Sequence, residues 1–320
     1  INSWRTRDIS IITVATRELR PLVRTRGSDD SPVWSPDGRA IVFASAGGDT
    51  TANYYKNGLV LRIPAEGGAT TRLAADFDEQ VSGVAWTPRG IFFNGRTRTA
   101  SRLFRIDPER GTTTVAVDTP MNVSSASFSA DGSRFAFLTQ DATHLAEVHT
   151  GALDGFRPAP VTTMSAQIAA WPIGTAEVVR WRSTDGAEIE GVLHKPRDFD
   201  PARKYPLLVV IHGGPTGIDV PQPLPGSVYP IAQWVAQGAL VLRPNYRGSA
   251  GYGEAFRALN VRNLGVGDMW DVMSGVDHLA RQGIVDTTRM GAMGWSQGGY
   301  ISAFLTTNTT RFKAISVGAG

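Results

Sequence analysis

Residues 294–299, Gly-Trp-Ser-Gln-Gly-Gly, decide the fold of the second half of this chain. They have the G-x-S-x-G form of a sharp turn that joins a strand to a helix and exposes a serine at its tip. An apolar run, 290–293, precedes them and a helical pattern, 297–307, follows them. A chain with 35 glycines can contain this motif by chance, but the flanking strand and helix favour the turn. We therefore expect Ser296 to act as a nucleophile.

Two main-chain N–H groups are expected to face the reacting carbonyl oxygen. Gln297 begins the helix, so its N–H and the helix N-terminus point toward developing negative charge. Residues 212–215, His-Gly-Gly-Pro, follow the buried-strand pattern Leu207–Ile211, which is where such folds place the second donor. Glycine lets the backbone turn its N–H inward. We assign Gly214 as the partner of Gln297, with Gly213 as the alternative.

The general base is expected to lie outside this chain. A serine hydrolase built on this turn carries an acid and then a histidine after the serine. The 24 residues that follow Ser296 contain no His, Asp or Glu. His212 precedes the serine, so we expect it to orient its loop, the alternative being a loop histidine with no catalytic part. We expect the complete protein to be a serine hydrolase with its acid and histidine beyond Gly320, and the 320 residues alone to lack them.

Other polar stretches are expected to support the site. Residues 246–253, Tyr-Arg-Gly-Ser-Ala-Gly-Tyr-Gly, follow a strand but lack the lysine of a phosphate-binding loop. We interpret them as a shaped loop over the rim of the site, with Tyr246 and Trp295 in supporting roles. Asp268 and Asp271 have the spacing of a helix cap and a first-turn acid. No histidine pair has metal-ligand spacing with carboxylates, so the sequence predicts neither a metal nor a cofactor.

The first half of the chain contains a repeat. The segments 34–38, 86–90 and 128–132 read Trp-Ser-Pro-Asp-Gly, Trp-Thr-Pro-Arg-Gly and Phe-Ser-Ala-Asp-Gly, and each precedes an apolar strand pattern. Their aromatic residues are 52 and 42 residues apart, and a second hairpin follows in the first two repeats. Four short strands per repeat of about 40–50 residues indicate propeller blades. We count three blades and a leading half, expect further blades upstream of Ile1, and keep a compact four-blade ring as the alternative.

Strands and helices alternate in the second half. This alternation predicts a mainly parallel sheet with helices on its faces, that is, a partial α/β-hydrolase fold preceded by part of an all-β propeller. We place the incomplete propeller blades at 1–165, the N-terminal portion of the hydrolase domain at 166–320, and a linker at 163–176. The expected strands are 178–182, 189–194, 207–211, 239–242, 290–293 and 314–317, and the expected helices are 228–237, 268–281 and 297–307.

Composition narrows the class of protein. Hydrophobic residues make up 42% and charged residues 19% of the chain, which fits a folded globular protein. The net charge of +3 comes without a basic tract, so we expect neither nucleic acid nor a membrane as partner. The absence of cysteine excludes disulfides and thiolate chemistry but leaves the compartment open. No apolar run approaches the roughly 20 residues that span a bilayer.

Three ordered motifs together resemble one known family. The stretches 212–215, 245–254 and 294–299, behind the Ser-Pro-Asp-Gly repeats, are similar to those of the prolyl oligopeptidase family, with its acylaminoacyl-peptidase and dipeptidyl-peptidase-like branches matching best. The resemblance implies a serine peptidase whose propeller caps the hydrolase domain and admits only short peptides. It also implies that Ser296 is the nucleophile and that the 212–215 loop contributes to the oxyanion hole.

Alternative functions stay open at this point. A carboxylesterase acting on small acyl esters would use the same serine site. An inactive fragment or pseudo-enzyme with a binding propeller is a third interpretation, favoured by the missing acid and base and opposed by the intact serine turn and donor loop. Short peptides or acyl-peptides are the expected substrates, and the sequence does not define which side chains are preferred. The protein could also form a homo-oligomer.

Overall fold

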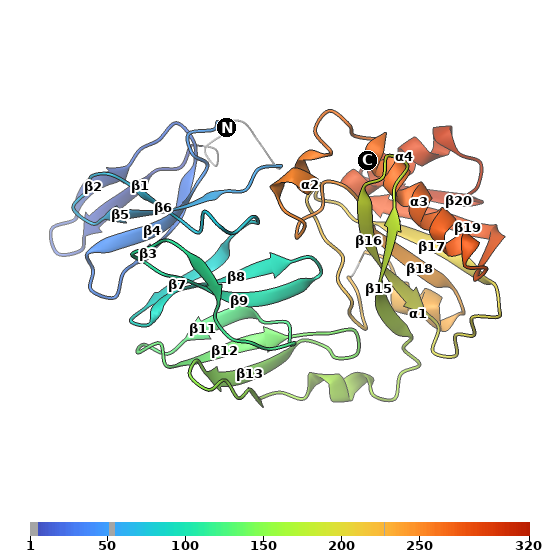
Figure 1. The fold of residues 1–320 in the computed structure, drawn as a ribbon, viewed down its shortest axis with the longest axis horizontal. Coiled ribbons are helices and arrows are strands. Elements are labelled where there is room, and N and C mark those ends of the chain that lie inside the picture. The colour runs from blue at the N-terminus through green and yellow to red at the C-terminus, as the bar shows by residue number, and fades with distance from the viewer. Residues whose placement is uncertain (1–5, 51–54, 227) are drawn as a thin grey trace. The chain divides into compact units, whose positions relative to one another are not determined.

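The computed structural model describes residues 6–50, 55–226 and 228–320. Contacts between Cα atoms divide the chain into two compact units. The first unit comprises the chain up to Thr97, Ser101–Thr139 and Val148–Val161. The second comprises Arg98–Ala100, Gln140–Glu147 and Thr162–Gly320. Figure 1 shows both units as ribbons.

Antiparallel sheets make up the first unit (Figure 1). A two-stranded sheet, β1 (Ile9–Thr13) and β2 (Glu18–Val23), is followed by three four-stranded sheets. This confirms the half blade and the three blades expected from the repeat. The third sheet also contains a second hairpin, β13–β14, which the sequence pattern does not predict. The strands are β3 (Asp29–Trp34), β4 (Ala40–Ser45), β5 (Leu59–Pro64), β6 (Thr71–Leu73), β7 (Ser82–Thr87), β8 (Gly90–Thr97), β9 (Ala100–Ile106), β10 (Thr113–Val115), β11 (Ser124–Phe128), β12 (Arg134–Thr139), β13 (Glu147–Ala152) and β14 (Ala159–Pro160).

The repeated Ser-x-Asp-Gly stretch forms the first turn of a blade by local hydrogen bonds. Ser35 Oγ donates to Asp37 Oδ1 over 2.6 Å, and the N–H of Arg39 donates to the same oxygen over 3.1 Å. In the third blade Ser129 Oγ donates to Asp131 Oδ1, also over 2.6 Å. These bonds stabilise the carboxylate form, so the pKa of both aspartates lies below its ordinary value. The repeat is therefore a turn signal with a direct physical cause.

The second unit is built on one six-stranded sheet in the order β15-β16-β18-β17-β19-β20. The pairs β15–β16 and β16–β18 are antiparallel, while β17 pairs in parallel with β18 and β19, and β19 in parallel with β20. The sheet is thus mixed, with parallel pairing around the expected serine turn. Its strands are β15 (Thr175–Arg182), β16 (Glu188–Lys195), β17 (Tyr205–Ile211), β18 (Leu240–Asn245), β19 (Val285–Trp295) and β20 (Ala314–Gly318).

Helices cover both faces of this sheet. α3 (Gly267–Arg281) and α4 (Gln297–Asn308) pack on a core that includes Leu207, Val209 and Leu242. α1 (Ile231–Ala236) packs on Val210 and Val241, whose side chains point to the other face because side chains alternate along a strand. The sheet is therefore buried on both sides, as its continuous apolar runs predict.

Two helical details differ from expectation. The helix expected over 228–237 begins only at Ile231, after Pro230, and ends at Ala236, shortly before Gly238 at φ +88°. A short helix, α2 (Glu254–Ala258), follows the glycine-rich 246–253 stretch and is not predicted by any periodic pattern. The segment 163–176, expected as a linker, lies in the second unit and contains a 3-10 helix, η2 (Met164–Ile168).

Candidate active site

Ser296 lies on a sharp turn between β19 and α4. Its backbone has φ +56° and ψ −120°, a combination that non-glycine residues rarely adopt. Its side chain is exposed, while the flanking Gly294 and Gly298 are buried. The N–H of Ser296 donates to Gly318 O over 2.9 Å, which ties the turn to the neighbouring strand β20. The turn therefore presents the serine side chain to solvent, with its main chain held by the neighbouring strand.

Close backbone packing explains the glycines on either side of the serine. A Cβ on Gly298 would overlap the carbonyl oxygen of Ile211, and a Cβ on Gly294 would overlap the backbone of Gly298. A Cβ on Gly299 would likewise overlap Gly318 O. These positions accept only glycine because strand and helix approach each other directly.

Parallel pairing brings the 212–215 loop to the serine. Ile211, the last residue of β17, pairs with Gly294 of β19, so both chains leave the sheet at the same edge. A Cβ on Gly213 would lie 3.1 Å from Ser296 Cβ and 2.7 Å from Trp295 O, which places Gly213 against the turn. Gly214 has φ +143°, a conformation that favours glycine.

The expected oxyanion donors have free N–H groups. Within the residues that the structure describes, the main-chain N–H groups of Gly213, Gly214 and Gln297 donate to no protein acceptor. For Gln297 this follows from its position as the first residue of α4, since the first N–H groups of a helix have no intrahelical partner. Such groups can stabilise an anion that forms on a carbonyl held above Ser296.

His212 is held by its own loop and by the stretch after β18. Its ring stacks on Tyr246 with centroids 4.5 Å apart, Nδ1 lies 2.8 Å from Gly213 O, and Nε2 lies 2.9 Å from Ser249 Oγ. The Tyr246 hydroxyl donates to His212 O over 2.9 Å. Burial lowers the pKa of the His212 imidazole and so favours its neutral form. Both ring nitrogens thus contact groups other than Ser296.

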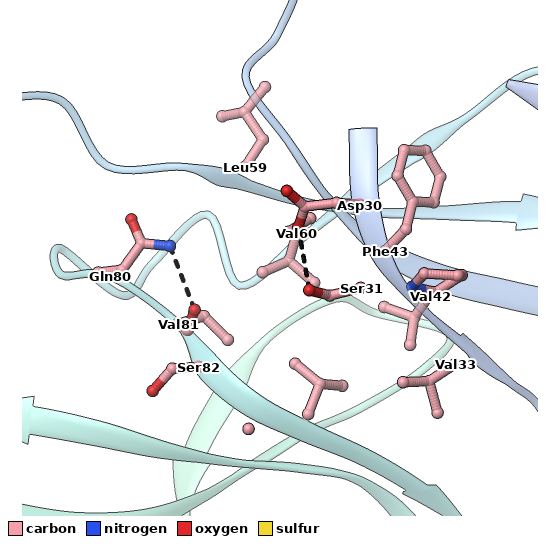
Figure 2. A pocket seen from close by; sticks show the side chains of 14 residues that line it. Asp30, Ser31, Val33, Val42, Phe43, Leu59, Val60, Gln80, Val81 and Ser82 are labelled. Carbon is pink, nitrogen blue, oxygen red and sulfur yellow. Dashed lines mark hydrogen bonds between the residues drawn. The ribbon is translucent and has the colours of Figure 1, made fainter. Parts of the chain in front are cut away.

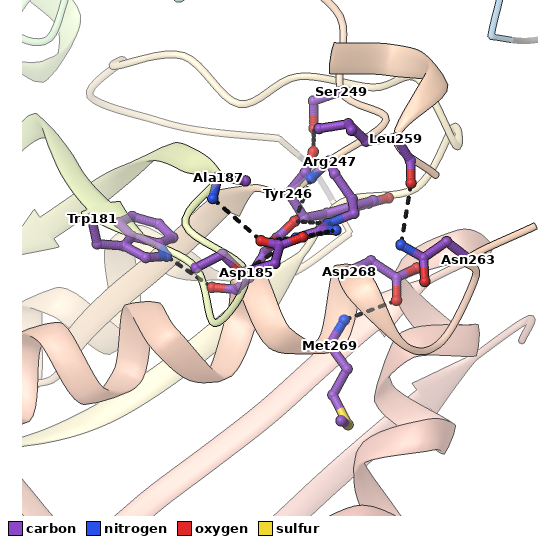
Figure 3. A network of polar contacts seen from close by, with 12 residues as sticks. Trp181, Asp185, Ala187, Tyr246, Arg247, Ser249, Leu259, Asn263, Asp268 and Met269 are labelled. Atoms are coloured by element: carbon purple, nitrogen blue, oxygen red, sulfur yellow. Dashed lines mark hydrogen bonds and ion pairs between the residues drawn. The ribbon is translucent and has the colours of Figure 1, made fainter. Parts of the chain in front are cut away.

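The 246–253 stretch is not the rim loop that we expected. Tyr246, Arg247 and Ser249 are all buried. Arg247 explains the difference, because its guanidinium donates to Asp271 Oδ1 over 2.8 Å and to Asp185 Oδ2 over 2.8 Å (Figure 3). Burial alone would lower the pKa of Arg247, but its hydrogen bonds to Asp271 and Asp185 raise it. The stretch is a buried support beneath the 212–215 loop.

The two aspartates of α3 also differ from expectation. The residue that precedes the helix is Val266, and Asp268 is a buried acid of the first turn instead of its cap. Burial raises the pKa of Asp268 to about 6. Asp271 is no surface acid but the buried partner of Arg247, and it accepts the Arg247 main-chain N–H over 2.7 Å. Gln297 Nε2 lies 3.4 Å from Asp268 Oδ2, so the residue after the serine also contacts this helix.

Sequence reasoning missed Asp219, Arg243 and Asn245. All three are buried, and they join the 212–219 loop to the end of β18. A signal was present, because polar residues at 243 and 245 alternate with apolar ones in a strand otherwise read as apolar. Trp295 is 53% exposed beside the serine and packs over Gly318, where a Cβ would lie 2.6 Å from its ring.

A separate cavity of about 400 Å³ lies within the first unit, between β3–β5 and the segment that leads into β7 (Figure 2). Its polar side chains already have partners. Asp30 pairs with Arg7 at 3.3 Å and accepts from Ser31, while Gln80 Oε1 accepts the Gly58 N–H over 2.9 Å.

Neither a metal site nor a membrane helix is found among the described residues. Within 6–50, 55–226 and 228–320, no cluster of three or more His, Cys, Asp or Glu side chains could hold a metal ion. Over the same residues no helix combines the length and apolar character needed to cross a bilayer.

Fold and site define a class of protein: an α/β-hydrolase sheet with a strand–serine–helix turn, accompanied by a unit of propeller blades. Residues 227–320 match the family model described as the prolyl oligopeptidase family. The match over these residues confirms the resemblance of the motifs to this family.

The chain is similar to several peptidases. Dipeptidyl-peptidase 5 of Porphyromonas gingivalis is 26% identical over 306 residues, which are 92% of this chain and 43% of that protein. The uncharacterized peptidase YuxL of Bacillus subtilis is 33% identical over 44% of this chain and 21% of its own length. The structure of acylaminoacyl peptidase from Pyrococcus horikoshii superposes with a TM-score of 0.79 at 20% identity, covering 97% of this chain and 47% of that one. The last likeness shows the fold, and this chain spans less than half the length of these relatives.

Proposed function

We propose that the protein containing this chain is a serine peptidase that hydrolyses short peptides, of acylaminoacyl- or dipeptidyl-peptidase type, through an acyl-enzyme on Ser296. The observation that carries the proposal is the exposed Ser296 at φ +56° and ψ −120°, with Gly213 against it. The peptidases among the similar proteins support a peptide as the substrate class.

The proposed reaction is a two-step acyl transfer. Ser296 Oγ attacks the carbonyl carbon of the scissile bond while its proton passes to a histidine base. The oxyanion accepts hydrogen bonds from the N–H groups of Gln297 and Gly214, with Gly213 as the alternative second donor. Collapse of the intermediate breaks the C–N bond, and the amine leaves with the proton of the base. Water then cleaves the ester by the same steps, which regenerates the serine.

The base and its acid partner are proposed to come from outside the described residues. His212 is proposed to orient the oxyanion loop, since its ring nitrogens face Gly213 and Ser249. Tyr246 supports that loop through its hydrogen bond to His212 O. Trp295, exposed beside the nucleophile, is proposed to border the acyl group of the substrate.

Fluorophosphonate labelling of the full-length protein tests this function. We expect one label on Ser296 and its complete loss in Ser296→Ala, with peptide turnover reduced by about 10⁴-fold or more. Ser316→Ala is the matched control, because Ser316 is exposed on the adjacent strand β20 but lies outside the turn. Labelling that persists in Ser296→Ala contradicts the assignment of the nucleophile.

Substrate comparison separates the remaining functions. Turnover of acyl-amino-acid and dipeptidyl anilides is expected to exceed that of short-chain aryl esters relative to their uncatalysed rates. Turnover of the esters alone would favour a carboxylesterase. A full-length protein that neither labels nor turns over either class would favour the inactive binding protein.

A further inference from the structure

The loop that follows β17 is fastened to the end of β18 at Asp219. The Asp219 N–H donates to Asn245 Oδ1 over 2.7 Å, and Asn245 Nδ2 donates to Asp219 O over 2.9 Å. Arg243 Nη2 donates to the Asp219 carboxylate. Both main-chain groups and the side chain of one loop residue are thus held by two residues of a core strand.

This fastening lies five residues after Gly214. Between the two, Gly217 O accepts the N–H of Ala250 over 3.1 Å. On the other side, His212 is fixed by Tyr246 and Ser249. The segment 212–219 therefore has anchors at both ends, and Gly213 and Gly214 lie between them with their N–H groups unused by the protein.

The two anchoring side chains share one face of the sheet. Arg243 and Asn245 alternate with Leu242, which points into the opposite core, so they lie on the face that α1 covers. His194 of β16 pairs with Val241 and so faces the same side. Asn245 Nδ2 lies 3.2 Å from the Tyr252 hydroxyl, which in turn donates to Glu190 over 3.0 Å. The anchor at Asp219 is part of an extended polar layer on this face.

The ion pair of Asp219 and Arg243 is poorly suited to stability alone. Asp219 is 4% and Arg243 9% exposed, so both charges lose most of their hydration. Within the described residues, Asp219 Oδ2, Arg243 Nε and Arg243 Nη1 are buried without a hydrogen-bond partner, and so is His194 Nε2 beside them. Apolar residues of similar volume would often be equally stable at such a place. A role in fixing one conformation explains the pair better than a role in folding.

We propose that Asp219 is a positioning residue, which Arg243 and Asn245 hold so that the Gly213 and Gly214 N–H groups point at the oxyanion. The proposal rests on the serine-peptidase function proposed above. It concerns stabilisation of the transition state, because the N–H groups act on charge that develops during the reaction.

The test replaces the ion pair in the full-length protein by Asp219→Leu with Arg243→Met. We expect the melting temperature to stay at or above that of the parent. We expect kcat for a peptide substrate to fall about 10- to 100-fold, with KM changed less than about threefold, and fluorophosphonate labelling to slow in parallel. A merely structural role would produce the opposite result, a lower melting temperature with parental kcat.

Controls keep the result interpretable. Asp277→Asn breaks a different ion pair of the same unit, that with Arg311 between α3 and the segment before β20, and should leave kcat unchanged. If the double variant does not fold, Arg243→Lys keeps the charge but loses the planar fork, and a folded variant with reduced kcat supports the proposal. Parental kcat in a folded double variant, or in Arg243→Lys when only that variant folds, overturns it. A parent that is not labelled on Ser296 contradicts the proposed function instead.

Discussion

We expect low pH to destabilise the folded second unit through His194. It is 4% exposed on β16, and burial, with Arg243 nearby, lowers its pKa to about 3. The unfolded chain binds a proton at this histidine below about pH 6.5, whereas the folded chain does not until about pH 3. The contribution of neutral His194 to stability is therefore complete above pH 6.5 and is lost as the pH falls toward 3.

We predict that His194→Asn weakens this acid sensitivity. Between pH 7 and about pH 4.5, the parent should lose about 2–3 kcal/mol more of its unfolding free energy than the variant. Urea unfolding at both pH values measures the difference. His144→Asn is the control, because His144 is exposed. Equal losses in parent and His194→Asn would contradict the prediction.

Asp268 has the opposite effect on the pH dependence of stability. Burial raises its pKa to about 6, so the folded state binds a proton that the unfolded state releases. Its contribution makes the protein more stable as the pH falls through 6. The unfolding free energy of the parent therefore depends on pH through two opposed contributions, those of His194 and Asp268. The comparison with His194→Asn isolates the contribution of His194.

At the scale of elements, Arg247 joins three of them. It follows β18, pairs with Asp271 in α3 and with Asp185 in the β15–β16 turn, and is 1% exposed (Figure 3). We predict that Arg247→Met lowers the unfolding free energy by about 3–5 kcal/mol, because it leaves Asp271 as an unpaired buried charge. Chemical denaturation measures the loss.

The matched control is Arg289→Met. Arg289 also pairs with an aspartate, Asp286, but its side chain is 60% exposed. An exposed pair contributes at most about 1 kcal/mol, so this variant should remain close to the parent. Similar losses in both variants would show that burial does not determine the effect.

The sequence predicts these elements well where a local cause acts. The hairpins follow from Asp-Gly turns such as Ser35–Gly38, and the serine turn follows from glycines that strand and helix packing require. The contact between Asp219 and Arg243 could not be predicted from local sequence, because it joins a loop residue to a strand residue 24 positions later in the chain. The prediction that 246–253 forms an exposed rim loop is wrong for a related reason. Arg247 is buried by its contacts with Asp271 and Asp185, and both of these residues are distant from it in the sequence.

At the scale of the molecule, each unit has its own hydrophobic core. Phe93 is fully buried in the first unit, and Leu242 is fully buried in the second. Compact units with separate cores commonly unfold as separate cooperative steps. We predict two transitions in a calorimetric scan of this chain, with Arg247→Met lowering only one of them.

A substitution in the first unit completes this test. Phe93→Ala removes a buried ring and should cost about 3–5 kcal/mol in the transition that Arg247→Met leaves in place. One shared transition, lowered by both variants, would show that the units unfold together.

The backbone at Ser296 has an evolutionary consequence. Holding a serine at φ +56° costs on the order of 1–3 kcal/mol, whereas glycine adopts this region freely. Homologues that have lost catalytic activity should therefore often carry glycine at this position, and the substitution should make them more stable. The stability of the turn alone therefore does not explain why a serine occupies position 296.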